Sequence, residues 1–155
     1  MAKEKSDLFR KTEYALYNYK TIDLKIKNIE IDIECLKNDI SIKAINYEEK
    51  VGPTNAFNSS VENEVIRREE KVAECIERLE AEKFLLACRK AKIENALKSL
   101  ADTERKIIEL KYFTKPKRTW LEIGLAVNMD KDHCRRKGKK LIHSLSDYIF
   151  RTSFI

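Results

Sequence analysis

The chain has 155 residues and a formal net charge of +6, and 37% of its residues are charged. It contains only three glycines and two prolines, and so few helix-breaking residues predict an all-α fold. No apolar run approaches the roughly 20 residues that span a bilayer, which excludes a membrane-spanning helix. The first residues, MAKEKSDLFRK, lack the apolar core of a secretory signal. The expected location is the cytoplasm.

The two parts of the chain carry different charge. Residues 1–100 hold 19 Lys and Arg against 19 Asp and Glu, whereas residues 101–155 hold 13 against 7. The whole excess of positive charge therefore lies in the last third. Such segregation is typical of a chain that binds a polyanion.

The four cysteines are too far apart in sequence to form a CxxC pair, and the histidines at 133 and 143 do not complete a metal-ligand spacing. We expect four reduced thiols on or near buried helix faces, and neither a metal nor another cofactor. The cysteines are Cys35, Cys75, Cys88 and Cys134.

The first 44 residues carry a heptad pattern of apolar side chains. Steps of four and three along one line predict a single long helix over residues 7–44. Leu24, Ile31 and Ile42 lie off that line, so the helix is expected to bury more than a narrow stripe. The line itself consists of Ala15, Tyr19, Ile22, Ile26, Ile29, Ile33, Leu36 and Ile40.

A second long helix is expected after Gly52-Pro53, which stops any helix. Ser59 and Glu62 have the spacing of a capping box at its start. Its apolar line is interrupted by Arg68, Glu82 and Arg89, and consists of Val61, Val65, Val72, Cys75, Leu79, Leu86, Ile93, Ala96 and Leu100.

Two such helices joined by a short loop predict an antiparallel hairpin, because each alone would leave an apolar stripe in water. The interruptions leave the hairpin thinly packed. We therefore expect one of two arrangements. Either a second copy of the chain completes the apolar seam, which makes a homodimer, or the hairpin folds back on the C-terminal domain. A stiff spacer without a partner is the third possibility.

The last third is predicted to hold three shorter helices. The first covers residues 103–113 with Asp102 as its N-cap, and a basic loop, TKPKR, follows it. The second, in TWLEIGLAV, opens with a capping box made by Thr119 and Glu122. The third runs from Lys131 to about Phe150, with the carboxylate of Asp130 capping its first amides.

The second and third of these helices predict a helix-turn-helix. Gly124 stands where the two helices must approach closely, and Asn128 stands in the turn, which needs a left-handed backbone. The expected core between the helices is Ile123, Val127, Met129 and Cys134, and the inward face of the third helix is Cys134, Gly138, Leu141 and Leu145. We therefore expect two domains, a helical hairpin over 1–100 for oligomerisation or spacing and a helix-turn-helix domain over 101–155.

The segments ERKIIELKYF and TWLEIGLAVNMDKDHCRRKGKKL resemble region 4 of sigma factors. More closely, TW-x-x-I, HCRRK and SSVENEVIRREEKVAE resemble the phage late-gene transcriptional activators of the ArpU/RinA group, over most of residues 58–146. The resemblance implies a regulator that binds DNA near the nucleoid of a bacterial host and acts with host RNA polymerase. Gly138 departs from the pattern, which usually has a larger apolar residue there. Glycine costs about 1 kcal/mol of helix propensity relative to alanine, so a kink or fraying is expected at this position.

In a helix-turn-helix, the start of the second helix enters the major groove. The candidates for reading base edges are Lys131, Asp132, His133, Arg135 and Arg136. The candidates for phosphate contacts are Lys139, Lys140, Lys115, Lys117, Arg118 and Thr119. Trp120 is interpreted as a packing residue rather than as a base stacker.

The sequence also bears on several other functions. A complete sigma factor would need an aromatic-rich segment to hold melted DNA, and the first hundred residues are regular amphipathic helices instead. A DNA-packaging subunit like the phage small terminase is the main alternative, because it too joins a helix-turn-helix to a helical hairpin. An enzyme is not expected, since the basic part has no cluster of acids and no evident nucleophile. A membrane-surface role is disfavoured because the basic helix lacks a broad apolar face.

Overall fold

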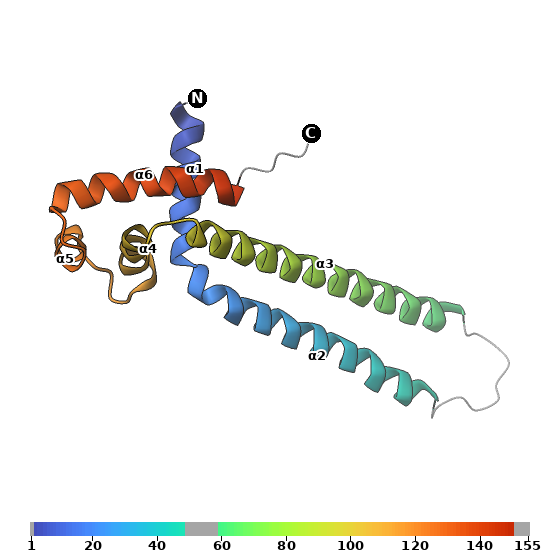
Figure 1. Ribbon diagram of the computed structural model, residues 1–155. Helices are drawn as coiled ribbons and strands as arrows, with labels where there is room; N and C mark the ends of the chain where they lie inside the picture. Colours follow the sequence, from blue (N-terminus) through green and yellow to red (C-terminus); the bar gives the residue numbers. More distant parts are fainter. Residues whose placement is uncertain (1, 49–58, 151–155) are drawn as a thin grey trace. The chain divides into compact units, whose positions relative to one another are not determined.

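The computed structural model describes the backbone of residues 2–48 and 59–150, and the side chains of residues 6–39 and 63–150. Within these ranges the chain is all-α, as predicted, with no strand. A 3-10 turn, η1 (Tyr19–Thr21), precedes α2, and a π-helical turn, η2 (Glu109–Phe113), continues α4. The α-helices are α1 (Ala2–Tyr17), α2 (Ile22–Glu48), α3 (Ser59–Lys98), α4 (Asp102–Ile108), α5 (Trp120–Ala126) and α6 (Lys131–Phe150) (Figure 1). None of the helices in the described ranges is long and apolar enough to cross a membrane.

The chain divides into two compact units. One comprises Met1–Ile22 and Ala87–Ile155, and is called here the helix-turn-helix unit; the other, Asp23–Leu86, is called the hairpin unit. The expected boundary at residue 100 lies inside the helix-turn-helix unit. Thus α1 and the end of α3, whose heptad patterns predict that they belong to the hairpin, lie in the same compact unit as α4, α5 and α6.

The prediction of a single helix over residues 7–44 is wrong, because the chain breaks into two helices, α1 and α2. At the break, Asn18 has φ −94° and ψ −1°, and its side-chain amide donates to the carbonyl of Tyr14 at 2.7 Å. The hydroxyl of Thr21 donates to the carbonyl of Asn18 at 2.8 Å. Asn and Thr side chains that bond to nearby backbone in this way compete with the regular helical pattern.

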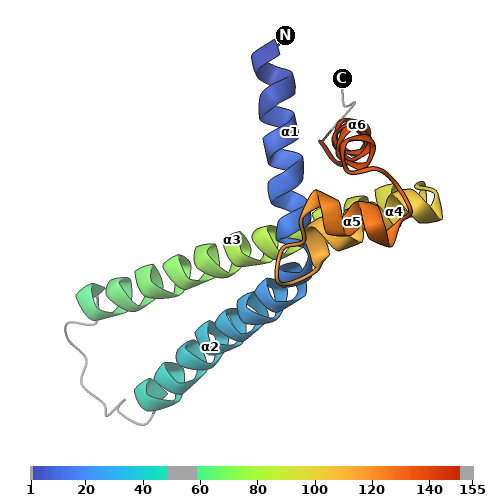
Figure 2. The same ribbon diagram turned by 90° about the vertical axis from the view of Figure 1, so that its left-hand side faces the viewer.

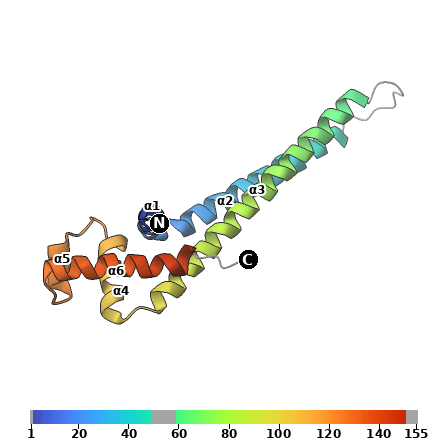
Figure 3. The ribbon, with the colours of Figure 1, turned by 90° about the horizontal axis from the view of Figure 1, so that it is seen from above.

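The helix-turn-helix unit holds most of the buried side chains. Within it α1 packs across α6, as Figures 1 and 3 show, and buries Thr12, Ala15 and Leu16. The first residue of α2, the end of α3, α4, η2, α5 and α6 contribute the other buried side chains, which are Ile22, Ile93, Ala96, Leu97, Ile107, Ile108, Tyr112, Ile123, Cys134, Leu141, Ile142, Leu145, Ser146 and Ile149.

The start of α4 differs from the prediction by one residue. Ala101, not Asp102, is the N-cap, because Ala101 has an extended backbone with ψ 155° and Asp102 is already helical. The backbone amide of Ala101 donates to the carboxylate of Glu104 at 3.4 Å. The acid that satisfies the free amide therefore comes from the first turn rather than from the cap position.

In the hairpin unit, α2 and α3 run antiparallel and side by side (Figures 1 and 2). Glu30 pairs with Lys83 at 3.6 Å and Lys37 pairs with Glu80 at 3.9 Å, so residue numbers rise along one helix as they fall along the other. The inner line of α2 includes Ile26, Ile29, Ile33 and Leu36, of which Ile29 and Ile33 are buried. The facing line of α3 is half-buried, at Val65, Val72, Cys75, Leu79 and Leu86.

The hairpin is therefore thinly packed, as the polar interruptions in the apolar line of α3 predicted. The expectation that Leu24 and Ile31 would also be buried is wrong, since their exposed fractions are 61% and 57%. The side chains of Ile42, Ser59 and Glu62 lie outside the described residues.

Candidate nucleic-acid interface

The helix α5 begins with the capping box that the sequence predicts. The hydroxyl of Thr119 accepts from the amide of Glu122 at 3.3 Å, and the carboxylate of Glu122 accepts from the amide of Thr119 at 2.7 Å. The bond from the backbone amide and a second one from the Thr119 hydroxyl lower the pKa of the Glu122 carboxyl. This arrangement fixes the direction in which the chain enters the helix-turn-helix.

The turn between α5 and α6 has both features expected of it. Asn128 has φ 54°, in the left-handed region that Asn tolerates better than most residues. The amide of Met129 donates to the carbonyl of Gly124 at 2.8 Å, and a β-carbon on Gly124 would lie 2.7 Å from the carbonyl oxygen of Met129. Glycine is therefore required sterically at position 124.

The start of α6 is capped by Asp130, as predicted. Its carboxylate accepts from the amide of Asp132 at 3.0 Å and from the amide of His133 at 3.3 Å. Capping by a carboxylate satisfies donors that would otherwise lack a partner and is favoured by the helix dipole. The helix that carries the basic residues therefore begins at a fixed position.

Side chains from α5 and α6 form the small core under the turn. Ile123 and Cys134 are fully buried, while Val127 and Met129 are half-buried. Burial raises the pKa of the Cys134 thiol. The expectation that every cysteine lies near a buried face is wrong for Cys35, which is exposed; Cys75 and Cys88 are half-buried.

Trp120 occupies the space that Gly138 leaves on the inward face of α6. A β-carbon at position 138 would lie 2.9 Å from Cζ3 of the indole. The prediction that α6 kinks or frays at Gly138 is wrong. The helix continues from Lys131 to Phe150, and the indole packs directly on the glycine. The ammonium of Lys111 lies 4.6 Å from the centroid of the Trp120 ring, on its face. Trp120 is thus a packing residue in this structure.

Every residue predicted to read bases is exposed on α6. The basic face of α6 is defined as Lys131, Arg135, Arg136, Lys139 and Lys140, and Asp132 and His133 are exposed as well. Among the described residues, none of the five cations of this face forms an ion pair. Lys137, by contrast, turns toward α4 and lies 3.5 Å from the carboxylate of Glu104. Five uncompensated cations therefore face solvent on one helix.

The loop before α5 adds three further exposed cations, Lys115, Lys117 and Arg118. The ammonium of Lys117 lies 4.5 Å from the centroid of the Tyr17 ring, over its face. Thr119, the last candidate for a phosphate contact, has its hydroxyl bonded to Glu122. Of the loop candidates, Lys117 and Thr119 are thus already held by contacts within the helix-turn-helix unit.

The sequence did not reveal that α1 supports this interface. The hydroxyl of Tyr112 donates to the carboxylate of Glu13 at 2.8 Å, across 99 positions of sequence. The ring of Phe9 lies 5.0 Å from that of His143 on α6. No local pattern signals a pairing over such a separation, since the heptad spacing of α1 is equally compatible with packing on α3.

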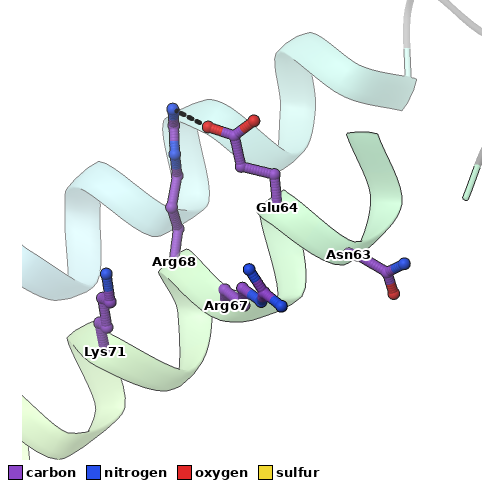
Figure 4. A pocket seen from close by; sticks show the side chains of 5 residues that line it. All are labelled: Asn63, Glu64, Arg67, Arg68 and Lys71. Atoms are coloured by element: carbon purple, nitrogen blue, oxygen red, sulfur yellow. Dashed lines mark hydrogen bonds and ion pairs between the residues drawn. The ribbon is translucent and has the colours of Figure 1, made fainter. Parts of the chain in front are cut away.

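A shallow pocket lies elsewhere, on the surface of α3 (Figure 4). Its five lining side chains all come from this one helix, and Arg68 pairs with Glu64 at 2.6 Å. Among the described side chains, no other element lines it. Within the described side chains, no three His, Cys, Asp or Glu residues gather in a way that could hold a metal ion. The basic face of α6 therefore remains the best candidate site.

The chain matches a protein-family model over most of its length. The family described as DUF722, protein of unknown function, matches residues 9–147. The chain belongs to this family. The DUF722 match extends from α1 into α6, so it takes in residues of both compact units. No curated protein and no solved structure matches the chain.

Proposed function

We propose that this DUF722 protein is a sequence-specific regulator of transcription that binds double-stranded DNA. It activates late genes of a phage or prophage together with host RNA polymerase, and it is not an enzyme. The observation that carries the proposal is the basic face of α6, presented by a helix whose start is capped and whose turn has helix-turn-helix geometry. The activator role rests on the resemblance to the ArpU/RinA group.

In the proposed complex the start of α6 enters the major groove. Arg135 or Arg136 bonds a guanine through its O6 and N7 atoms, and such a bidentate pair is worth about 1–3 kcal/mol of discrimination. Lys131 and His133 lie in the same first turns and reach neighbouring base edges. Asp132 either accepts from a cytosine amino group or stays outside the groove, because phosphates repel it.

Phosphates are contacted by cations that lie farther along α6 and in the preceding loop. Lys139 and Lys140 on α6 and Lys115 and Arg118 in the loop are exposed and form no ion pair within the described residues. Lys117 joins them by leaving the Tyr17 ring, and the Thr119 hydroxyl joins them by leaving the Glu122 carboxylate. These contacts position the protein without reading sequence.

A selection of bound sequences from random duplex DNA tests the DNA-binding part. The wild type, Arg135→Ala with Arg136→Ala, and Lys137→Ala are compared. Lys137 is the matched control, since it belongs to the same helix but pairs with Glu104. A defined motif that the double variant loses and Lys137→Ala keeps supports the proposal. Salt-sensitive binding with no enriched motif in the wild type contradicts it.

Transcription from a template that carries the selected motif tests the activator part. Stimulation of bacterial RNA polymerase that depends on the motif is the expected result. The alternative function, a DNA-packaging subunit like the small terminase, predicts motif binding without stimulation, together with assembly into rings. The two readouts therefore separate the two functions.

A further inference from the structure

A second line of regularly spaced side chains, three apolar and two asparagines, runs along α2 on the side away from α3. Leu24, Asn28, Ile31, Cys35 and Asn38 follow one another at steps of four, three, four and three, and all five are exposed. Leu24 and Ile31 are large apolar side chains with exposed fractions of 61% and 57%. This set is called here the outer line.

The outer line and the inner line lie on opposite faces of α2. Asn28 and Ile31 each follow a member of the inner line, Ile26 and Ile29, by two positions. Two residues of an α-helix turn through about 200°. Because the buried Ile29 faces α3, Ile31 must point away from it. The outer line is therefore open to a partner without disturbing the hairpin.

The spacing is that of a coiled-coil seam rather than of scattered surface residues. Single exposed apolar residues are ordinary, but here Leu24, Ile31 and Cys35 lie on one stripe with two asparagines at the remaining positions of the repeat. In heptad notation, Asn28 and Cys35 occupy a positions, and Leu24, Ile31 and Asn38 occupy d positions. A second helix with the same repeat would fit this stripe.

The two asparagines indicate what that second helix is. An apolar partner helix would leave the amides of Asn28 and Asn38 without hydrogen-bond partners, and a buried amide without a partner is destabilising. A second copy of α2, parallel and in register, places each asparagine opposite its own counterpart, where the two amides bond to each other. Asparagine at an a position is known to specify register and oligomeric state in this way.

The charged residues beside the outer line favour one orientation of the two helices less strongly than the asparagines do. In the parallel pair Lys27 meets Asp32 of the other copy, which is favourable, while Glu34 meets Asp39, which is not. Lys27, Asp32 and Glu34 are exposed and form no ion pair within the described side chains. Each of these is an exposed pair, which contributes little to stability, so the two effects nearly offset. An antiparallel pair in which Asn28 faces Ile31 of the other copy leaves the Asn28 amides of both copies without a partner.

We propose that the outer line of α2 is a homodimer interface, in which two copies of the chain pair their α2 helices in parallel and in register. The interface belongs to the hairpin unit and does not depend on the DNA-binding function. Each dimer carries two copies of the helix-turn-helix.

Sedimentation of the full chain tests the interface. The wild type should sediment as a dimer, and Ile31→Lys should raise the dissociation constant at least tenfold. Because Ile31 is exposed in one copy, the variant should keep the wild-type helical content by circular dichroism. Phe84→Lys is the control, since Phe84 is 67% exposed on α3 and lies off the outer line. A dimer that Phe84→Lys disrupts and Ile31→Lys does not would overturn the proposal, as would a monomeric wild type.

Two further variants test the register. Asn28→Ile should tighten association at least tenfold and permit higher oligomers, because the polar residue that limits the seam is removed. In a background with Cys75→Ser and Cys88→Ser, a short bismaleimide should link Cys35 to Cys35 of the second copy, and Cys35→Ser should abolish the product. No effect of Asn28→Ile, or no linked dimer through Cys35, would contradict the parallel arrangement.

Discussion

The indole of Trp120 occupies the space that a β-carbon on Gly138 would fill, and this close approach joins the start of α5 to the middle of α6. The side chain that the helix-turn-helix pattern usually has on α6 is thus supplied by the neighbouring helix. The contact also explains why a glycine inside a 20-residue helix does not interrupt it. The orientation of the basic face of α6 therefore depends on this one close approach.

Gly138→Ala is expected to lower the free energy of unfolding by about 1–3 kcal/mol, because the new methyl group overlaps the indole. In a Trp120→Leu background the same substitution should instead be stabilising, by about 1 kcal/mol of helix propensity. Urea unfolding of the four proteins measures both effects. The same sign in both backgrounds would show that the contact with Trp120 does not determine the role of the glycine.

A second prediction follows from the left-handed backbone conformation of Asn128. Asn128→Val should destabilise the protein by about 1–2 kcal/mol, since a β-branched residue resists positive φ. Asn128→Gly should be nearly neutral, because glycine adopts this conformation readily. Thermal unfolding of both variants checks the pair, and equal losses would mean that contacts of the side chain, rather than the backbone angle, explain the asparagine.

The sequence predicted the capping residues and the turn of α5 and α6 well, because their signals are local. The capping residues Thr119 and Asp130, the close approach at Gly124 and the turn at Asn128 each act within a few positions of themselves. The break at Asn18 was missed because the heptad line continues through it from Ala15 to Ile22. The heptad pattern reports that a face is apolar, not which element covers it, and so it could not reveal that α1 packs on α6. The basic face was located from the sequence, whereas the contact between Tyr112 and Glu13 depends on the tertiary fold alone.

The hydrogen bond between Tyr112 and Glu13 predicts a dependence of stability on alkaline pH. Burial, together with the hydrogen bond to Glu13 and its charge, raises the pKa of the Tyr112 phenol well above its ordinary value of about 10. The folded state therefore keeps a proton that the unfolded state loses, and the stability contributed by Tyr112 is present below about pH 10 and falls above it.

Tyr112→Phe measures this contribution. The variant should lose about 1 kcal/mol of unfolding free energy at neutral pH, the usual net value of a hydrogen bond. The difference between wild type and variant should shrink as the pH rises above about 10. Denaturant unfolding from pH 7 to pH 10.5 gives the comparison directly. A difference that stays constant over this range would contradict the raised pKa.

The salt dependence of DNA binding distinguishes the basic face from the paired lysine beside it. The logarithm of the binding constant falls with the logarithm of salt concentration by about 0.9 for each phosphate contact. Lys139→Ala with Lys140→Ala should therefore reduce the slope by about 1.8, whereas Lys137→Ala should leave it unchanged because Lys137 pairs with Glu104. Fluorescence anisotropy at several salt concentrations supplies the slopes. Equal slopes for all three proteins would exclude Lys139 and Lys140 from phosphate contact.

The most direct test of the central claim is dimethyl sulfate protection on a duplex that carries the selected motif. This reagent methylates N7 of guanine, which lies in the major groove where α6 is proposed to bind. The wild type is expected to protect specific guanines, Arg135→Ala with Arg136→Ala to lose that protection, and Lys137→Ala to retain it. Tight binding with no guanine protected in the motif, or protection that survives the loss of both arginines, would contradict recognition through the basic face of α6.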